Sequence, residues 1–309
     1  MLVFLATDLS PTLNTRINMT WIFLTVFATF MQAWRNAFQS KLGQTVKVPG
    51  VTLARFIWAG PIAAVYLALL YYLEPTTIPV FKQAYWLYVV GASGMQIVAT
   101  GLMVKLFKMN NYAVGAGLAK SEAIVAAVLG MLFFGTTLSL LGWLGVIIGG
   151  VAVFLMSAAK GFKGLSLTTI LMGLACGSAF ALTSLWVREA SLQLNLGFPY
   201  SAAWVLLMVI SIQTMALVAY LLLTDPTTLK ALWQRPGLTL LISVSSCLGS
   251  IGWFSAMSLQ NVPYVKTLGQ VEIFFTLLIS TYWLKQKVQI KDAFGLALIA
   301  VAAVLVIWG

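Results

Sequence analysis

The sequence contains no histidine and very little charge. Only 8% of its 309 residues are charged, and its two cysteines, Cys176 and Cys247, lie singly inside apolar stretches. Histidine is the most common general base and a frequent zinc ligand, so metal-assisted chemistry is not expected. The isolated cysteines match neither a disulfide framework nor a CxxC metal clip. We therefore predict no metal site and no cofactor.

Apolar residues dominate what is present. They make up 61% of the chain and the mean hydropathy is +0.97, whereas soluble domains are about 45–50% apolar and about 25% charged. A helix of about 20 apolar residues can cross a bilayer, so the composition predicts an integral membrane protein. The net charge of +11 comes from 18 basic and 7 acidic residues. Because the basic residues are scattered singly through predicted loops, they indicate a bilayer-embedded protein and no nucleic-acid partner.

Apolar runs between charges and Pro or Gly predict ten transmembrane helices. Residues 1–18 are interrupted by Asp8, Pro11 and Arg16 and are predicted to be an N-terminal tail. The predicted spans are 19–40, 51–72, 84–106, 112–134, 138–158, 167–187, 200–223, 237–258, 264–284 and 292–308.

The chain resembles itself at an offset of 150 residues. Asn111 then aligns with Asn261, and Glu122, one of two carboxylates deep inside predicted spans, aligns with Glu272, the other. Five spans in each half would make the second copy enter the membrane from the opposite side, as in many transporters. The predicted fold is all-α and integral to the membrane, with ten transmembrane helices as two inverted five-helix repeats, residues 19–159 and 160–309.

Four polar residues share one face of the first predicted span. Gln32, Arg35, Asn36 and Gln39 follow i, i+3, i+4, i+7 spacing, so their side chains point into protein or water. They could form an interhelical polar zipper. The cation among them favours the alternative, the lining of a cavity.

The fourth and ninth predicted spans also carry charge near their centres. The fourth has Lys120 and Glu122, and the ninth has Lys266, Gln270 and Glu272, with Lys266 and Gln270 on a common face. Residues two apart on a helix point in different directions. We therefore expect each charge to find its partner on another helix.

Arg35 and Arg55 are the partners expected for Glu122. The glutamates could be structural ion-pair members, or titratable groups whose charge changes with substrate or proton occupancy. Arg55, near the start of the second span, could reach the lipid headgroups or bind an anion. Small residues on two further spans predict close helix packing: Ser243, Ser246, Cys247 and Ser250, and Gly142, Gly145 and Gly149.

Several short motifs resemble the EamA-type drug/metabolite transporter superfamily. They are Ala33-Trp34-Arg35-Asn36 followed by Lys41, Arg55-Phe56, and the glycine-rich segment from Gly142 to Val151, echoed by Gly295. The resemblance implies ten spans in two repeats. It also implies cytoplasmic termini, whereas eleven basic residues in the loops after odd-numbered spans, against four on the other side, place the termini outside. The family's Gly-Glu helix ends are absent, since Gly135-Thr136 and Leu284-Lys285 stand there.

These observations predict a secondary active transporter, an exporter rather than an enzyme, in the inner (cytoplasmic) membrane. It would move a small polar, anionic or zwitterionic metabolite by alternating access, with proton coupling through Glu122 and Glu272. The alternative is cation or drug efflux coupled through the same glutamates. An intramembrane enzyme is less expected, because histidine and paired acidic motifs are missing. The expected substrate pathway comprises Gln32, Arg35, Asn36, Arg55, Lys120, Glu122, Lys266, Gln270 and Glu272.

Overall fold

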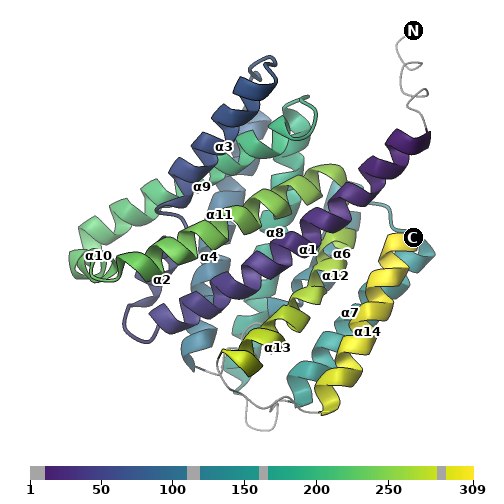
Figure 1. Ribbon diagram of the computed structural model, residues 1–309. Coiled ribbons are helices and arrows are strands. Elements are labelled where there is room, and N and C mark those ends of the chain that lie inside the picture. Colours follow the sequence, from purple (N-terminus) through teal and green to yellow (C-terminus); the bar gives the residue numbers. More distant parts are fainter. Residues whose placement is uncertain (1–10, 110–118, 160–165, 284–289) are drawn as a thin grey trace.

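The computed structural model describes residues 11–109, 119–159, 166–283 and 290–309, and these segments contain helices and connecting turns without a strand (Figure 1). In chain order the helices are α1 (Pro11–Leu42), α2 (Val48–Ala54), α3 (Ala59–Leu73), α4 (Gln83–Met109), α6 (Glu122–Phe134), α7 (Leu140–Ala159), α8 (Leu167–Gln193), α9 (Tyr200–Thr224), α10 (Pro226–Trp233), α11 (Pro236–Leu259), α12 (Val262–Leu268), the 3₁₀ turn η1 (Gly269–Val271), α13 (Glu272–Tyr282) and α14 (Ile290–Trp308).

Many of these helices are suited to a bilayer. Six segments are long and apolar enough to cross one: α2 with α3, α4, α8, α9, α11, and α12 through α13. Large apolar side chains such as Leu69, Phe133 and Leu223 are exposed on the outside of the bundle. An exposed apolar surface of this kind needs an apolar environment. The helices are therefore compatible with a multi-pass membrane protein.

Where their residues are described, the predicted spans coincide with a helix or with consecutive helices, but their ends and continuity differ. Helix α1 begins at Pro11, eight residues before the predicted start of the first span, so part of the predicted tail is helical. The second predicted span is divided between α2 and α3, and the ninth is interrupted by η1. Residues 1–10, the aligned Asn111 and the first seven residues of the fourth predicted span, 112–118, lie outside the described residues.

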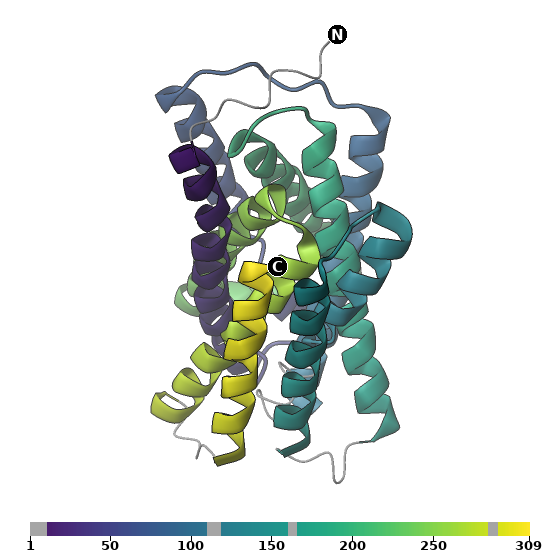
Figure 2. The same cartoon turned by 90° about the vertical axis from the view of Figure 1, so that its right-hand side faces the viewer.

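Long helix pairs form the body of the bundle. Helix α1 packs along α11, α4 along α8, and α7 along α14. In Figure 1, α14 (yellow) lies against α7 (teal), and α1 and α11 run side by side on a diagonal; Figure 2 shows α14 at the front of the bundle when it is turned by 90°. A Cβ atom on Gly252 of α11 would lie 2.8 Å from the Leu24 carbonyl oxygen of α1, so this pair depends on a glycine for its close approach.

The glycines of α7 also lie at close helix contacts, as predicted. A Cβ atom would lie 2.6 Å from the Tyr264 ring at Gly142 and 2.6 Å from Val306 of α14 at Gly145. At Gly149 it would lie 2.3 Å from the side-chain oxygen of Gln270. The prediction of close packing on this face is confirmed.

Candidate functional site

Two helix starts place carboxylates in the middle of the bundle. Glu122 is the first residue of α6, directly after the turn at Lys120 and Ser121. Glu272 is the first residue of α13, directly after η1. The amino-terminal turn of a helix has unpaired N–H groups and a partial positive charge, which stabilise a carboxylate there. The two glutamates aligned in the sequence therefore occupy equivalent local positions.

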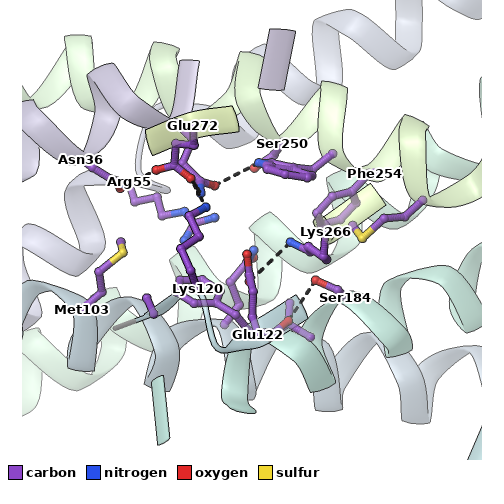
Figure 3. Close-up of a pocket in the computed structure, with 17 residues that line it drawn as sticks. Asn36, Arg55, Met103, Lys120, Glu122, Ser184, Ser250, Phe254, Lys266 and Glu272 are labelled. Atoms are coloured by element: carbon purple, nitrogen blue, oxygen red, sulfur yellow. Dashed lines mark hydrogen bonds and ion pairs between the residues drawn. The ribbon is translucent and has the colours of Figure 1, made fainter. Parts of the chain in front are cut away.

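The glutamates are paired crosswise with lysines. Lys120, which precedes α6, donates a hydrogen bond to Glu272. Lys266 of α12 lies with its Nζ atom 3.6 Å from an oxygen of Glu122. All four side chains are no more than 7% exposed. Each segment thus supplies the cation for the other segment's carboxylate, as Figure 3 shows.

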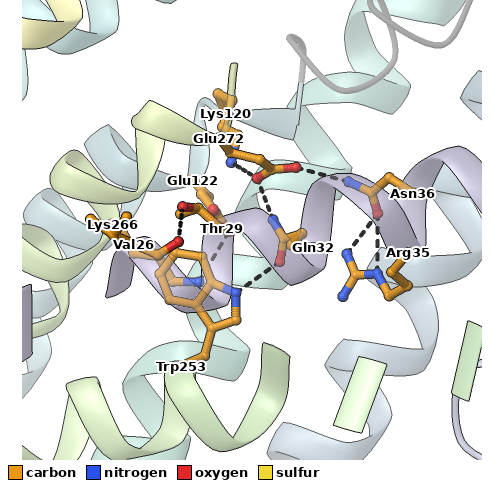
Figure 4. A network of polar contacts seen from close by, with 10 residues as sticks. All are labelled: Val26, Thr29, Gln32, Arg35, Asn36, Lys120, Glu122, Trp253, Lys266 and Glu272. Carbon is orange, nitrogen blue, oxygen red and sulfur yellow. Dashed lines mark hydrogen bonds and ion pairs between the residues drawn. The ribbon is translucent and has the colours of Figure 1, made fainter. Parts of the chain in front are cut away.

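Glu272 also accepts hydrogen bonds from the polar face of α1 (Figure 4). Gln32 donates to one carboxylate oxygen at 2.5 Å and Asn36 to the other at 2.9 Å. Arg35 holds the Asn36 side chain by donating to its amide oxygen at 2.7 and 3.1 Å, and Trp253 donates to Gln32 at 2.9 Å. The predicted polar face of α1 therefore points into the protein and surrounds a buried anion.

Arg55 lies in the break between α2 and α3 and is 3% exposed. Its Nε donates to Ser246 of α11 at 3.1 Å, and its Nη1 donates to Thr100 of α4 at 2.6 Å. The freed carbonyl of Ala54 accepts from Ser243 of α11 at 2.7 Å. Broken helices occur at membrane depth where neighbouring side chains satisfy the backbone. Ser243 and Ser246 of α11 thus provide hydrogen-bond partners for the break. Arg55 is buried and points into the bundle, not toward lipid headgroups.

A small cavity lies between these groups. Seven of the nine predicted pathway residues line it: Gln32, Asn36, Arg55, Lys120, Glu122, Lys266 and Glu272. Its free volume is about 30 Å³, room for about two water molecules. In this conformation a metabolite would have to displace the charged side chains from one another.

Other lining residues were not among the predicted pathway residues. They include Gln96 of α4, Ser184 and Phe180 of α8, and Ser250, Trp253 and Phe254 of α11. Ser250 belongs to the serine-rich face predicted for the eighth span, and Trp253 and Phe254 follow it in the sequence. Gln96 can be detected in the sequence as an amide inside an apolar span. It accepts a hydrogen bond from Gln213 of α9 at 2.7 Å, which extends the polar region to that helix.

Arg35 and Gln270 do not line the cavity. Arg35 is buried beside it and acts on Asn36. The η1 turn changes the helical phase after Lys266, so Gln270 faces α7 and packs against Gly149, and the predicted common face of Lys266 and Gln270 is wrong. Glu122 forms an ion pair with Lys266, which was not an expected partner, because α12 passes beside the start of α6, and the expected Arg55 acts on Glu122 electrostatically.

The charges on the cavity wall do not balance. Among the described residues it has three cations, Arg55, Lys120 and Lys266, and two carboxylates, Glu122 and Glu272. The hydrogen-bond acceptors described for Arg55 are neutral hydroxyl groups. Glu122 also acts electrostatically on Arg55, so three buried cations share two carboxylates, and this excess of cations stabilises an anion that enters the cavity. The net positive charge of the wall therefore favours an anionic group.

A third ion pair lies at the end of the bundle. Lys47, in the connection from α1 to α2, donates to Asp225 between α9 and α10 at 2.7 Å. Thr227 and Thr228 donate to the same carboxylate at 2.5 and 2.8 Å. The Lys47 ammonium and then these hydroxyls hold the pKa of Asp225 well below its ordinary value. The pair connects two loops distant in the sequence.

Comparisons with known proteins identify the fold alone. No family model and no curated protein sequence matches the chain. A solved structure described as "Crystal structure of protein" is similar with a TM-score of 0.68 and 13% sequence identity, over 94% of this chain and 97% of that chain. A solved protein of similar length therefore has a similar helical arrangement.

Proposed function

We propose that the chain is a secondary active transporter that exports a small polar, anionic or zwitterionic metabolite across the inner (cytoplasmic) membrane by alternating access. The observation that carries this proposal is the crosswise pairing of Lys120 with Glu272 and of Lys266 with Glu122 in a buried cavity. A static scaffold has little need for five buried charged side chains near helix breaks, Arg55, Lys120, Glu122, Lys266 and Glu272, because each costs free energy in the bilayer. A transport site uses such groups to bind a solute during part of its cycle.

The transporter would consist of two inverted five-helix repeats. Helix packing supports this arrangement, since α1 packs along α11 as α4 packs along α8, and α7 packs against α14. With α1 equivalent to α8 and α4 to α11, the first two contacts are the same contact made by the two repeats. The helix starts at Glu122 and Glu272, 150 residues apart, support it as well. Discontinuous helices near a midplane site are common in transporters with such repeats.

Membership of the EamA-type drug/metabolite transporter superfamily is part of this proposal. The motif Trp34-Arg35-Asn36 supports it through its position, because Asn36 contacts the central carboxylate of Glu272. The Arg55-Phe56 motif supports it in the same way, because Arg55 lines the cavity. Export and the inner membrane come from this resemblance.

The substrate would bind through a carboxylate or another anionic group near Arg55. The cavity wall carries one more cation than carboxylates among the described residues, and Trp253, Phe254 and Phe180 add apolar surface. A zwitterion could also use Glu122, whose partner Lys266 lies at 3.6 Å. This pair is longer than the Lys120–Glu272 contact, and it would open at the lower cost.

One observation favours the second candidate, efflux of organic cations through the two glutamates. The ammonium of Lys266 lies 4.2 Å from the centre of the Trp253 ring while it also faces Glu122. An aromatic face and a carboxylate together bind organic cations. A cationic drug could take the position of this ammonium.

Solute counterflow into proteoliposomes distinguishes the two candidates. We expect small carboxylates or amino acids to exchange across the membrane and Arg55→Gln to abolish that exchange. Efflux of cations would be supported if quaternary ammonium ions exchange in both the wild type and Arg55→Gln. In that case no carboxylate or amino acid should exchange. No exchange of either class would remove the proposed transport function.

A further inference from the structure

An apolar groove, separate from the central cavity, lies between three helices on the outside of the bundle. Val48, Pro49 and Thr52 of α2 form one wall, Ile97 and Gly101 of α4 the second, and residues of α9 including Tyr220 the third. Its volume is about 330 Å³. This is about eleven times the free volume of the central cavity.

The groove presents hydrocarbon rather than polar groups. The Thr52 hydroxyl donates to the Val48 carbonyl at 2.9 Å within its own helix, so this polar atom is satisfied without a ligand. Gly101 leaves the floor open, because a Cβ atom there would come no closer than 3.9 Å to another side chain. A linear apolar chain therefore fits the groove without leaving a buried polar atom unpaired.

Lysines surround the end of the groove where α2 begins and α9 finishes. Lys105 lies one turn beyond Gly101 on the same face of α4 and is exposed. Lys108 donates to the Val46 carbonyl at 2.8 Å, beside the connection into α2, and Lys47 precedes α2 directly. Asp225 neutralises one of the three, which leaves this end of the groove positively charged.

We propose that this groove binds one acyl chain of an anionic phospholipid, with the phosphate of the headgroup at Lys105 and Lys108. Apolar surface alone would accept any lipid, whereas the lysines add selectivity for a negatively charged headgroup. Lys105 and Lys108 lie near the end of α4, and a cluster of basic side chains at a membrane surface attracts anionic lipid headgroups. The site is independent of the transported solute.

Lipid-dependent thermal unfolding of the delipidated full chain in an uncharged detergent tests the proposal. We expect phosphatidylglycerol to raise the unfolding midpoint by about 3 °C or more and phosphatidylcholine to raise it by less. Gly101→Phe should fill the groove and abolish the shift. Gly94→Phe is the matched control on α4, since nothing lies within 4 Å of a Cβ atom there, and it should retain the shift.

The charge of the site is tested by Lys105→Gln, which leaves the groove intact. It should bring the shift caused by phosphatidylglycerol down to the shift caused by phosphatidylcholine, and native mass spectrometry should show one tightly held lipid fewer than in the wild type. Equal shifts by both lipids in the wild type, or a full phosphatidylglycerol shift in both Gly101→Phe and Lys105→Gln, would overturn the proposal. A dimer that Gly101→Phe converts to a monomer would identify the groove as an interface between copies and would overturn it as well.

Discussion

Lys120 donates a hydrogen bond to Glu272, a residue 152 positions further along the chain, and both side chains are almost fully buried. This contact joins the start of α6 to the start of α13. Gln32 and Asn36 of α1 bind the same carboxylate, so three separate segments meet at one buried anion. The contact therefore contributes to the stability of the bundle as well as to the candidate site.

Removal of either Lys120 or Glu272 should destabilise the protein, and the effects of the two substitutions should be strongly coupled. Removal of one partner of a buried ion pair costs about 3–5 kcal/mol, because the other charge stays buried. We expect Lys120→Met and Glu272→Gln each to destabilise the protein by an amount near this range, and the double variant by at least 1 kcal/mol less than their sum. Thermal or denaturant unfolding in detergent measures the cycle. Strictly additive effects would contradict a direct contact.

The second crosswise pair should show weaker coupling. Lys266 and Glu122 are 3.6 Å apart, and Lys266 is also stabilised by the Trp253 ring at 4.2 Å. We expect the Lys266→Met and Glu122→Gln cycle to give less coupling than the Lys120 and Glu272 cycle under the same conditions. Equal or larger coupling would contradict the weaker contact described for Lys266 and Glu122.

The close contact of α1 with α11 should depend on Gly252. A Cβ atom there would lie 2.8 Å from the Leu24 carbonyl oxygen and 2.9 Å from Ala28. Gly252→Ala should lower the free energy of unfolding by about 1–3 kcal/mol through overpacking. Gly94→Ala, where the Cβ position is open, is the control and should be neutral or stabilising by up to about 1 kcal/mol. A Gly252→Ala variant as stable as the control would contradict the packing described.

The break between α2 and α3 should depend on Ser243. Its hydroxyl donates to the Ala54 carbonyl and accepts from the Trp58 N–H. Ser243→Ala leaves these backbone groups without that partner and should cost about 1–3 kcal/mol in unfolding free energy. The hydroxyl of Ser258 bonds to the Ser255 carbonyl of its own helix, so Ser258→Ala is the control with a smaller effect. Equal effects of the two substitutions would argue against a role of Ser243 in the break.

Acidification should weaken the contact between the α1–α2 and α9–α10 connections. The pKa of Asp225 is lowered in the folded protein, so its contribution to stability is present above the ordinary aspartate pKa of about 3.9 and is lost as the pH falls through the lower folded value. We expect the difference in unfolding midpoint between the wild type and Asp225→Asn to shrink from pH 6 to pH 3. High salt should shrink it too, because Lys47 is exposed. A difference that is constant with pH would contradict the pairing.

The sequence predicts the location of the helices well because transmembrane apolar runs are long and clearly bounded. It also predicts that Glu122 and Glu272 are special, since a buried carboxylate is costly and the two align at one offset. Helix breaks are not visible in this signal, because the segments that contain Arg55 and η1 are still long and apolar enough as wholes to cross a bilayer. For that reason the predicted direction of the Gln270 side chain is wrong, and the ion pair of Glu122 with Lys266 is not predicted. Both depend on the helical phase after a break.

The most direct test of the central claim, that solute enters the charged cavity, is pH-dependent flux in everted membrane vesicles. The account predicts that Glu272→Gln and Glu122→Gln abolish the flux or remove its pH dependence. Glu74→Gln, a change of the same chemistry at an exposed position after α3, should leave both intact. Wild-type flux with an unchanged pH profile in both cavity variants would contradict the account.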